Sequence, residues 1–451
     1  MIREDVIQKI KEYDGEKVKF AVVDIDGVLR GKIISKSKFL KAMDEGISFC
    51  NVIFGWDVND TVYDNSEVTG WHTGYPDSKV AIDLSTFRTI PWDADIPFFL
   101  GDFSTSDTLA DVCPRTLLKN VTRRCEDSGY KPLFANEFEW FNFRERPQTL
   151  KDKNYRNPRP LTPGMFGYSI LRSSQNASFF NALYNLLHQF RVPLESQHTE
   201  TGDGVYEASI AYTDILEAAD RGVLFKTAVK EIAYRHEIVA TFMAKWSNDF
   251  PGCSGHIHQS LWDKDEEKNL FFDDARSNNM SRLMEQYIAG QLYCLPHILP
   301  MYAPTVNSYK RLVPGSWAST SVSWGIENRT TALRVIIPSS SSARLETRVP
   351  GADANPYLSM AASLASGLYG IENELSLDIQ KTKGNEYKDS DNEPLPGTLK
   401  EAIDAMKSSD VARELFGESF TDHFIRTREW EWKQFTKQVT GWELKRYFEI
   451  I

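Results

Sequence analysis

Pairs of ionisable side chains recur at two-residue spacing along the sequence. Glu137 and Glu139 lie in the segment ANEFEWF, and His256 and His258 lie in SGHIHQS. Residues two apart on a strand project from the same face, so each pair is expected to act together. Two carboxylates on one apolar strand repel each other unless a cation neutralises them. Carboxylates with one or two imidazoles suit Mg²⁺ or Mn²⁺ holding phosphates better than a structural zinc site.

A second set of acidic residues flanks a glycine-rich turn. Glu200 and Glu207 lie at the two ends of ETGDGVYE, where the glycines allow the chain to reverse and return both carboxylates to one point. Glu346 alternates with Arg344 and Arg348 in ARLETRV, again at strand spacing. Taken alone, each motif has a plainer interpretation, in which the charges mark solvated loops or the wet face of a half-exposed strand.

Arginines are concentrated in one stretch of the chain, among apolar strands and Gly/Pro turns. They are Arg311, Arg329, Arg334, Arg344 and Arg348. A planar guanidinium can hold two oxygens of a carboxylate or phosphate at once. The stretch therefore indicates a polyphosphate or carboxylate site, and the alternative for part of the set is interface salt bridges.

The run VVDIDGVL near the N-terminus resembles the nucleophile loop of haloacid-dehalogenase-type phosphatases, in which Asp24 would attack phosphate. That loop leads into a helix in such enzymes, whereas residues 30–34 here read as a strand. We therefore expect a hairpin from residues 18–23 and 28–35, with Asp26 and Gly27 in its turn.

These residues must be positioned by a mixture of strands and amphipathic helices, which predicts an α+β fold based on antiparallel sheet. We divide the chain into domains at 1–112 and 113–451, because Pro114 suits the start of a helix over 115–128. Further helices are expected over 176–190 and over 214–247, the latter broken at 220–222. Residues 381–397 are polar and are expected to form an exposed loop.

Composition excludes several classes of protein. The chain has 451 residues and a formal net charge of −11, which argues against a nucleic-acid surface. Five scattered cysteines without a CxxC pair fit a reducing compartment. The N-terminus does not read as a signal peptide, and no apolar run is long enough to span a bilayer. We expect a cytoplasmic protein that binds neither membrane nor nucleic acid.

Together and in this order, the motifs resemble those of the glutamine synthetase family, from about residue 18 to the C-terminus. The segments that carry the resemblance are NEFEWF, HTETGDGVYE, GCSGHIHQSLW, NSYKRLVPG, ENRTTALRV and ARLETRVPGADANPYL. The resemblance implies a β-grasp-like N-terminal domain and a glutamine-synthetase-type catalytic domain with a curved antiparallel sheet. It also implies a dodecamer of two hexameric rings with active sites between subunits.

The resemblance assigns metal ligands residue by residue. The metal ion nearer glutamate would be held by Glu139, Glu200 and Glu207. The metal ion that bridges the ATP phosphates would be held by Glu137, His256 and Glu346. The family pattern is two or three Mg²⁺ or Mn²⁺ ions per site, with ATP as co-substrate.

The remaining roles concern the substrates. Arg311 would bind the α-carboxylate of glutamate beside the Gly252 backbone, and Arg329 and Arg348 would stabilise the transferring phosphoryl group. Tyr168 would lie on the amine side of the pocket. The residues that would contact the nucleotide are Glu195, Tyr212, His258, Ser260, Arg334 and Arg344.

The amine site departs from the family pattern. Members that use ammonium present a glutamate after the RLVPG-like motif, whereas the matching position here is Trp317. An indole cannot accept a proton from ammonium, but its face can support a larger protonated amine. The alternative is that Trp317 packs beneath its own loop. The DGSS-like ammonium motif is also missing, which leaves Asp57 or Asp60 as replacements, and Pro251 replaces an asparagine of the glutamate lid.

We therefore expect an ATP-dependent carbon–nitrogen ligase that joins glutamate to an organic amine or polyamine through γ-glutamyl phosphate. The resemblance is closest to the γ-glutamyl-polyamine and γ-glutamyl-amine ligases. Two alternatives are an authentic glutamine synthetase that uses ammonium and a non-catalytic structural homologue.

Overall fold

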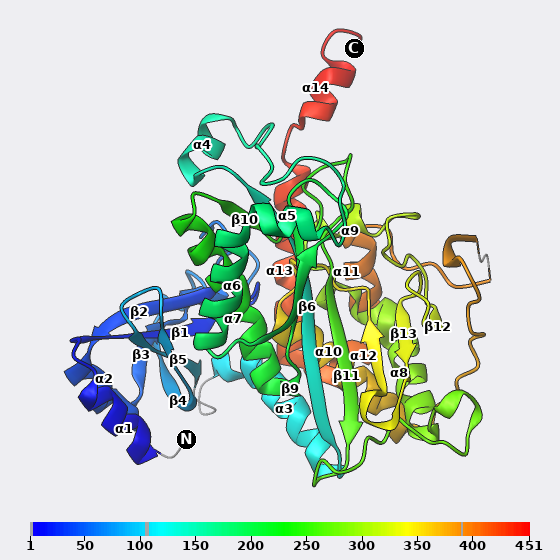
Figure 1. Cartoon of the computed structure of the whole chain (residues 1–451), viewed down its shortest axis with the longest axis horizontal. Helices are drawn as coiled ribbons and strands as arrows, with labels where there is room; N and C mark the ends of the chain where they lie inside the picture. Colours follow the sequence, from blue (N-terminus) through cyan, green and yellow to red (C-terminus); the bar gives the residue numbers. More distant parts are fainter. Residues whose placement is uncertain (1–2, 104–107, 389–390) are drawn as a thin grey trace.

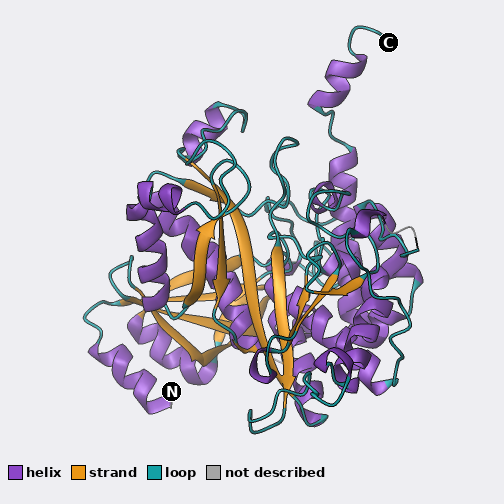
Figure 2. Ribbon diagram, turned by 45° about the vertical axis from the view of Figure 1, so that its right-hand side comes forward, coloured by secondary structure: helices purple, strands orange, loops and turns teal. Residues whose placement is uncertain are grey.

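The computed structural model describes residues 3–103, 108–388 and 391–451. Two β-sheets and a large set of helices make up the chain (Figures 1 and 2). The smaller sheet comes from the N-terminal quarter of the sequence, drawn in blue in Figure 1, and the larger sheet runs through the rest of the molecule. The α+β class that the sequence predicts is confirmed.

The smaller sheet has five strands in the order β2-β1-β5-β4-β3. Its region contains α1 (Arg3–Glu12), β1 (Lys17–Val23), β2 (Leu29–Ser35), α2 (Lys36–Glu45), β3 (Ile47–Cys50), η1 (Asn51–Phe54), β4 (Asp77–Ile90), β5 (Ile96–Phe103) and η2 (Thr108–Val112). Neighbouring strands are antiparallel except β1 and β5, which are parallel. The predicted domain boundary falls between η2 and the next helix.

The first hairpin forms as expected, and its turn explains the phosphatase-like motif. β1 pairs antiparallel with β2, and Gly27 takes a φ of 80° in the connection. The Asp24 carboxylate is buried and accepts hydrogen bonds from the backbone N–H of Asp26 at 3.0 Å, the backbone N–H of Val28 at 2.9 Å and Arg30 Nε at 2.8 Å. Because these donors occupy both oxygens and a strand follows, Asp24 stabilises a turn and is not placed as a nucleophile.

The larger sheet follows the order β12-β13-β14-β11-β6-β8-β7, and β9 and β10 also pair with β6. Its strands are β6 (Lys131–Phe143), β7 (Leu194–Thr199), β8 (Val205–Ile210), β9 (Thr213–Asp214), β10 (Val239–Thr241), β11 (Gly255–Trp262), β12 (Trp324–Ile326), β13 (Leu333–Ile336) and β14 (Arg344–Thr347). The pairs are antiparallel except β12 with β13 at the edge, which are parallel. The predicted antiparallel sheet is thus confirmed apart from this edge pair.

Helices cover one face of the larger sheet. The helices after the first sheet are α3 (Pro114–Asp127), α4 (Pro147–Asp152), α5 (Ile170–Gln175), α6 (Ala177–Gln189), α7 (Ile215–Arg235), η3 (Ser277–Asn279), α8 (Arg282–Ile298), η4 (Leu299–Met301), α9 (Ser308–Arg311), η5 (Ser340–Ser342), α10 (Pro356–Glu372), η6 (Glu386–Lys388), α11 (Leu399–Ser408), α12 (Val411–Phe416), α13 (Glu418–Thr436) and α14 (Gly441–Tyr447). The almost fully buried α10 packs against α3, α7 and α8. None of the described helices is long and apolar enough to cross a bilayer.

The predicted break and the predicted end of the 214–247 helix are wrong. α7 runs without interruption from Ile215 to Arg235, and β10 follows it. A Cβ on Gly222 would lie 2.7 Å from Asn136 Nδ2, so this glycine allows α7 to approach β6 closely. Asp220 is buried because it pairs with Arg115 of α3 at 2.9 Å. Tertiary packing, rather than a break in the helix, accounts for the Asp-Arg-Gly sequence.

The prediction that residues 381–397 form an exposed loop is wrong in part. Thr382, Glu386 and Leu395 are buried, although many of their described neighbours are exposed. The C-terminal region is helical, from α11 to α14. Its last helix, α14, projects away from the rest of the chain (Figures 1 and 2).

Candidate active site

The site occupies the face of the larger sheet that the helices leave uncovered. On β6, Asn136 and Phe138 point to α7, where Asn136 Nδ2 donates to the Ala218 carbonyl at 3.0 Å and Phe138 stacks on Phe225. Strand alternation turns Glu137 and Glu139 to the opposite face. The same alternation holds on the neighbouring strands. The residues that share the open face are Glu207 and Ser209 of β8, His256, His258 and Ser260 of β11, and Arg344 and Glu346 of β14.

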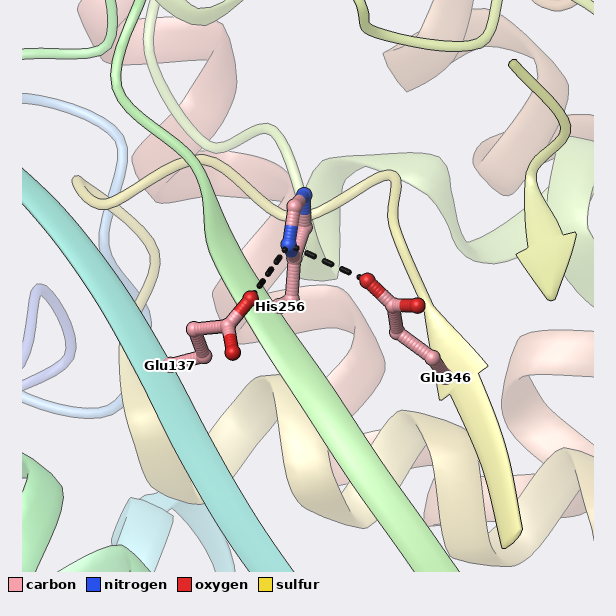
Figure 3. A group of neighbouring side chains, drawn as sticks. All are labelled: Glu137, His256 and Glu346. Atoms are coloured by element: carbon pink, nitrogen blue, oxygen red, sulfur yellow. Dashed lines mark hydrogen bonds and ion pairs between the residues drawn. The ribbon is translucent and has the colours of Figure 1, made fainter. Parts of the chain in front are cut away.

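Strand register brings the first candidate metal group together. His256 lies opposite Glu137 in the β11–β6 pair, and β14 runs on the other side of β11. His256 Nδ1 is 3.2 Å from Glu137 Oε1 and 3.2 Å from Glu346 Oε1 (Figure 3). These three side chains offer ligand atoms that all lie within 4.8 Å of one another. The sequence predicted the same three residues.

Cationic groups surround this cluster. Arg334 Nη1 is 2.9 Å from Glu346 Oε2, and Arg348 forms an ion pair with Glu346 Oε1. Despite the opposing effect of burial, Arg348 and the two histidines lower the pKa of Glu346 to about 2. The carboxylate therefore remains ionised at neutral pH.

A second candidate metal group lies at the β7–β8 hairpin. His198 pairs in register with Glu207, and its Nε2 lies 3.5 Å from Glu207 Oε1. Its Nδ1 lies 3.9 Å from Glu200 Oε1, and the three residues offer ligand atoms within 4.8 Å of one another. The turn thus brings Glu200 and Glu207 together as expected, while His198 is a member that sequence reasoning missed.

Glu139 lies in the same cavity but in a different environment. It is directly opposite Glu207 in the β6–β8 pair, and its Oε2 accepts a 2.6 Å hydrogen bond from the backbone N–H of Ser254. The assignment of Glu139 to the metal nearer glutamate stays a prediction.

The electrostatics of the two groups fit divalent cations. Five glutamates line one cavity: Glu137, Glu139, Glu200, Glu207 and Glu346. Burial raises the pKa of Glu207 to about 8, against a favourable contact with His198 and with further upward contributions from the charges of Glu137 and Glu139. A bound divalent ion would relieve this repulsion, and an oxygen-rich donor set with imidazoles suits Mg²⁺ or Mn²⁺.

Every site residue predicted from the sequence lines one of two adjoining cavities. The first, of about 480 Å³, is lined by Glu137, Glu139, Tyr168, Glu200, Glu207, Gly252, His256, His258, Arg311, Trp317, Arg329, Arg334, Arg344, Glu346 and Arg348. The second, of about 400 Å³, is lined by Glu195, Tyr212 and Ser260, and it shares Glu137, Ser209, His258 and Arg344 with the first. The shared residues mark the junction where polyphosphate is expected between a nucleotide and an acceptor.

The end of the first cavity where glutamate is predicted to bind is tightly packed. Arg311 is 3% exposed, and two of its N–H groups donate to the carbonyls of Val349 at 2.9 Å and Arg348 at 3.2 Å. A Cβ on Gly252 would lie 2.4 Å from the Ala244 carbonyl and 2.7 Å from Arg311 Cγ. Only glycine fits at position 252. The Gly252 backbone therefore lies beside the Arg311 guanidinium at the cavity wall, and the N–H groups of Arg311 that do not bond to Val349 and Arg348 can face a ligand.

The predicted amine end is aromatic and open. The Tyr168 ring stacks on His198 with centroids 4.5 Å apart, and partial desolvation, with the charges of Glu200 and Glu207, raises the pKa of Tyr168. Trp317 lines the cavity and is 61% exposed, so the interpretation that it packs beneath its loop is wrong.

Neither candidate for the missing ammonium aspartate lines this cavity. Asp57 Oδ2 accepts a 2.9 Å hydrogen bond from Trp430 Nε1, and its Oδ1 accepts from the backbone N–H of Asn59 and Thr61. Asp60 pairs with Arg30 at 2.7 Å. Asp57 is thus fully engaged in a turn.

Comparison with known proteins agrees with the fold. The family model "Glutamine synthetase, catalytic domain" matches residues 111–447. The protein is an ATP-dependent ligase that forms carbon–nitrogen bonds. The chain belongs to the glutamine synthetase family, whose members use ATP and divalent metal ions.

Its relatives include enzymes named as glutamine synthetases and enzymes named for organic amines or their amides. The chain is 51% identical over 450 residues to type-1 glutamine synthetase 2 of Dictyostelium discoideum, covering 99% of this chain and 86% of the relative. It is 38% identical to glutamate–isopropylamine ligase of Pseudomonas sp over 98% of this chain and 97% of the relative. It is 34% identical to gamma-glutamylethanolamide synthetase of Streptomyces coelicolor over 97% and 93%.

A solved structure shares the whole architecture. GmaS in complex with ADP is 25% identical to this chain, with a TM-score of 0.85 and coverage of 99% of both chains. The likeness spans the smaller sheet as well as the larger one.

Proposed function

We propose that the protein joins the γ-carboxyl group of glutamate to an organic amine, with γ-glutamyl phosphate as the intermediate. The observation that carries this proposal is Trp317, which lines the amine end of the cavity and is 61% exposed. An indole cannot take a proton from ammonium, but its face attracts an alkylammonium group. The names of two relatives, an isopropylamine ligase and an ethanolamide synthetase, support the same choice.

In the first step, the γ-carboxylate attacks the γ-phosphorus of ATP, the bond from that phosphorus to the bridging oxygen breaks, and ADP leaves as γ-glutamyl phosphate forms. We assign the nucleotide to the second cavity, its phosphates to the junction and glutamate to the space beside Arg311 and Gly252. Arg329 and Arg348 would neutralise charge on the transferring group, which is the main contribution a protein makes to phosphoryl transfer.

We assign Glu137, His256 and Glu346 to the metal ion at the phosphates, and Glu139, Glu200 and Glu207, with His198 beside them, to the metal ion nearer glutamate. Bound Mg²⁺ or Mn²⁺ supplies charge neutralisation and orientation of the phosphate oxygens. Arg334 and Arg348 keep Glu346 ionised and oriented for this task.

In the second step, the amine attacks the acyl carbon, phosphate leaves, and the nitrogen loses a proton. Tyr168 and Trp317 would hold the amine between aromatic surfaces. Phosphate is a good leaving group, which explains why the carboxylate is activated first.

The test is phosphate release from ATP with glutamate and Mg²⁺, across ammonium, methylamine, isopropylamine, ethanolamine, putrescine, spermidine and aniline, with each product identified by mass. Turnover with an organic amine and little turnover with ammonium would support the proposal. Preference for ammonium would overturn it.

Glutamine synthesis from ammonium is the second candidate, and the name of the 51% identical relative favours it. In that case a neighbouring subunit would have to present Asp60 to the cavity, since Asp60 is exposed, although it pairs with Arg30, whereas Asp57 is half-buried and bound by Trp430. Substitution of Asp60 by Asn would then abolish ammonium use and would have little effect on organic amines.

We also propose a dodecamer of two hexameric rings, with active sites completed between subunits. Helix α14 projects from the chain (Figure 1). This helix and the residues after it expose large apolar side chains, namely Trp442, Leu444, Tyr447, Phe448, Ile450 and Ile451. Such a surface is expected to be buried against another copy. Native mass spectrometry checks this, and a monomer would contradict it.

A further inference from the structure

Residues 379–388 lie beside the two irregular segments that carry Trp317 and Arg329. The backbone N–H of Thr382 donates to the carbonyl of Trp324 at 3.0 Å. Trp324 begins β12, which joins these two segments in the sequence. We call residues 379–388 the bracing segment.

The bracing segment holds the turn that presents Arg329. On one side of this arginine, Asn328 Nδ2 donates to the Gly384 carbonyl at 2.9 Å. On the other side, Thr330 Oγ1 lies 3.3 Å from the same carbonyl and accepts a 3.1 Å hydrogen bond from the backbone N–H of Glu386. Both neighbours of Arg329 are therefore fixed to the bracing segment.

The same segment holds the loop that follows the cavity tryptophan. The Tyr387 hydroxyl donates to the carbonyl of Ala318, the next residue after that tryptophan, at 3.1 Å. Glu386 Oε1 accepts hydrogen bonds from the hydroxyl groups of Ser319, at 2.8 Å, and Ser321. The side chains of Tyr387 and Glu386 thus form hydrogen bonds with Ala318, Ser319 and Ser321 of this loop.

Glu386 is an unusual hydrogen-bond acceptor for this loop. This residue is 2% exposed, and no Lys, Arg or His of the described residues forms an ion pair with it. Burial raises the pKa of Glu386, and the hydroxyl groups of Ser321 and Ser319 oppose this rise. Because a buried carboxylate without its donors is costly, any displacement of the loop from the bracing segment is strongly disfavoured.

We propose that Glu386 and Tyr387 are positioning residues that hold Trp317 in place at the amine end and thereby set the affinity for the nucleophile. The inference rests on the proposed function, because it takes Trp317 as the wall of the amine site. Neither residue lines the cavity, so both act through the loop.

The kinetic test compares Tyr387→Phe, Glu386→Ala and Glu386→Gln. Loss of the Tyr387 hydroxyl is expected to raise the KM for the amine about threefold to tenfold, the range for one hydrogen bond, with the KM for ATP within about twofold of the original. Glu386→Ala is expected to have a larger effect, and Glu386→Gln, which keeps an acceptor oxygen, is expected to restore most of the affinity. Tyr302→Phe is the matched control, since it removes a buried hydroxyl 3.1 Å from Ser363 Oγ in the helical layer.

Hydrogen exchange followed by mass spectrometry provides a readout that does not depend on the substrate. Faster exchange in residues 313–330 of Glu386→Ala, with α10 unchanged and a raised amine KM, supports the inference. Unchanged exchange in 313–330, equal changes in every KM, or the same amine effect in Tyr302→Phe overturns it. If the unmodified protein uses only ammonium, the proposed function fails, yet the variants still decide this inference: a raised KM for ammonium supports it and an unchanged one refutes it.

Discussion

Replacing Trp317 by glutamate tests whether this position selects the nucleophile. Trp317 has a φ of 61°, a conformation that is equally unfavourable for both side chains, so Trp317→Glu changes the chemistry and leaves the backbone requirement the same. The new carboxylate is expected to attract ammonium, and the loss of the ring is expected to weaken binding of an alkylammonium ion.

The magnitude follows from the exposure of the site. A carboxylate 4 Å from ammonium gains about 4 kcal/mol at an effective dielectric constant of about 20. Trp317 is 61% exposed, so solvent screening reduces this to about 1 kcal/mol. Loss of a cation–π contact at an exposed site removes about 0.5–1 kcal/mol from amine binding. The preference for amine over ammonium should therefore fall by about 1.5–2 kcal/mol, or about tenfold to thirtyfold.

The assay is the ratio of kcat/KM for the best organic amine to kcat/KM for ammonium, with ATP and glutamate saturating. Trp317→Gln is the control, because it removes the ring without adding a charge and should lower amine use without a gain in ammonium use. An unchanged ratio in Trp317→Glu would refute the reasoning and would mean that the nucleophile binds elsewhere.

Four further predictions concern other parts of the molecule. Gly252→Ala should raise the KM for glutamate at least about tenfold, because its Cβ would lie 2.7 Å from Arg311 Cγ; an unchanged KM would contradict the assigned glutamate site. Asp220→Ala should lower the free energy of unfolding by about 3 kcal/mol, measured by urea denaturation, because it removes the carboxylate that accepts hydrogen bonds from both Nε and Nη2 of the buried Arg115. Burial lowers the pKa of His423 to about 3, so below pH 6.5 the unfolded state binds more protons than the folded state. The free energy of unfolding should therefore fall by about 2 kcal/mol between pH 6.5 and pH 5. The variant His423→Leu should not show this loss. Chelation of divalent ions should abolish amide synthesis, and Mg²⁺ or Mn²⁺ should restore it, as followed by phosphate release.

Strand alternation made much of the site predictable. Glu137 and Glu139, and likewise His256 and His258, needed only a strand to share a face. Their grouping with Glu346 depends on the pairing of β6, β11 and β14, which spacing does not specify. The resemblance to a known family supplied that pairing in advance.

His198 is a site residue that strand alternation alone does not identify. It faces the cavity because β7 pairs with β8 so that His198 lies opposite Glu207, after an irregularity between Leu194 and Ser196. A one-residue change in register turns a side chain to the other face of a sheet. The sequence contains no signal for that irregularity, so His198 was missed while Glu207, next to the turn, was found.

The α7 error has a different physical origin. Asp220 and Gly222 are poor helix formers at an exposed position, which is why the sequence favours a break. The folded chain buries both of them, one as the partner of Arg115 and the other as a close contact with Asn136. Contacts with residues more than eighty positions away in the sequence keep α7 continuous, and local helix propensity does not take such contacts into account.

The two halves of the site are built from different kinds of structure, and under the proposed function this difference would allow one fold to accommodate different amines. The groups assigned to phosphoryl transfer stand mainly on β6, β8, β11 and β14, where cross-strand pairing fixes each side chain against its neighbours. Tyr168 and Trp317 lie on irregular segments with φ values of 55° and 61°, and both are largely exposed. A substitution on these segments can alter the nucleophile without moving a strand. Under the proposed function, the activating chemistry would be retained while specificity changes, and the contacts that hold the Trp317 loop would then be as important to specificity as the tryptophan itself.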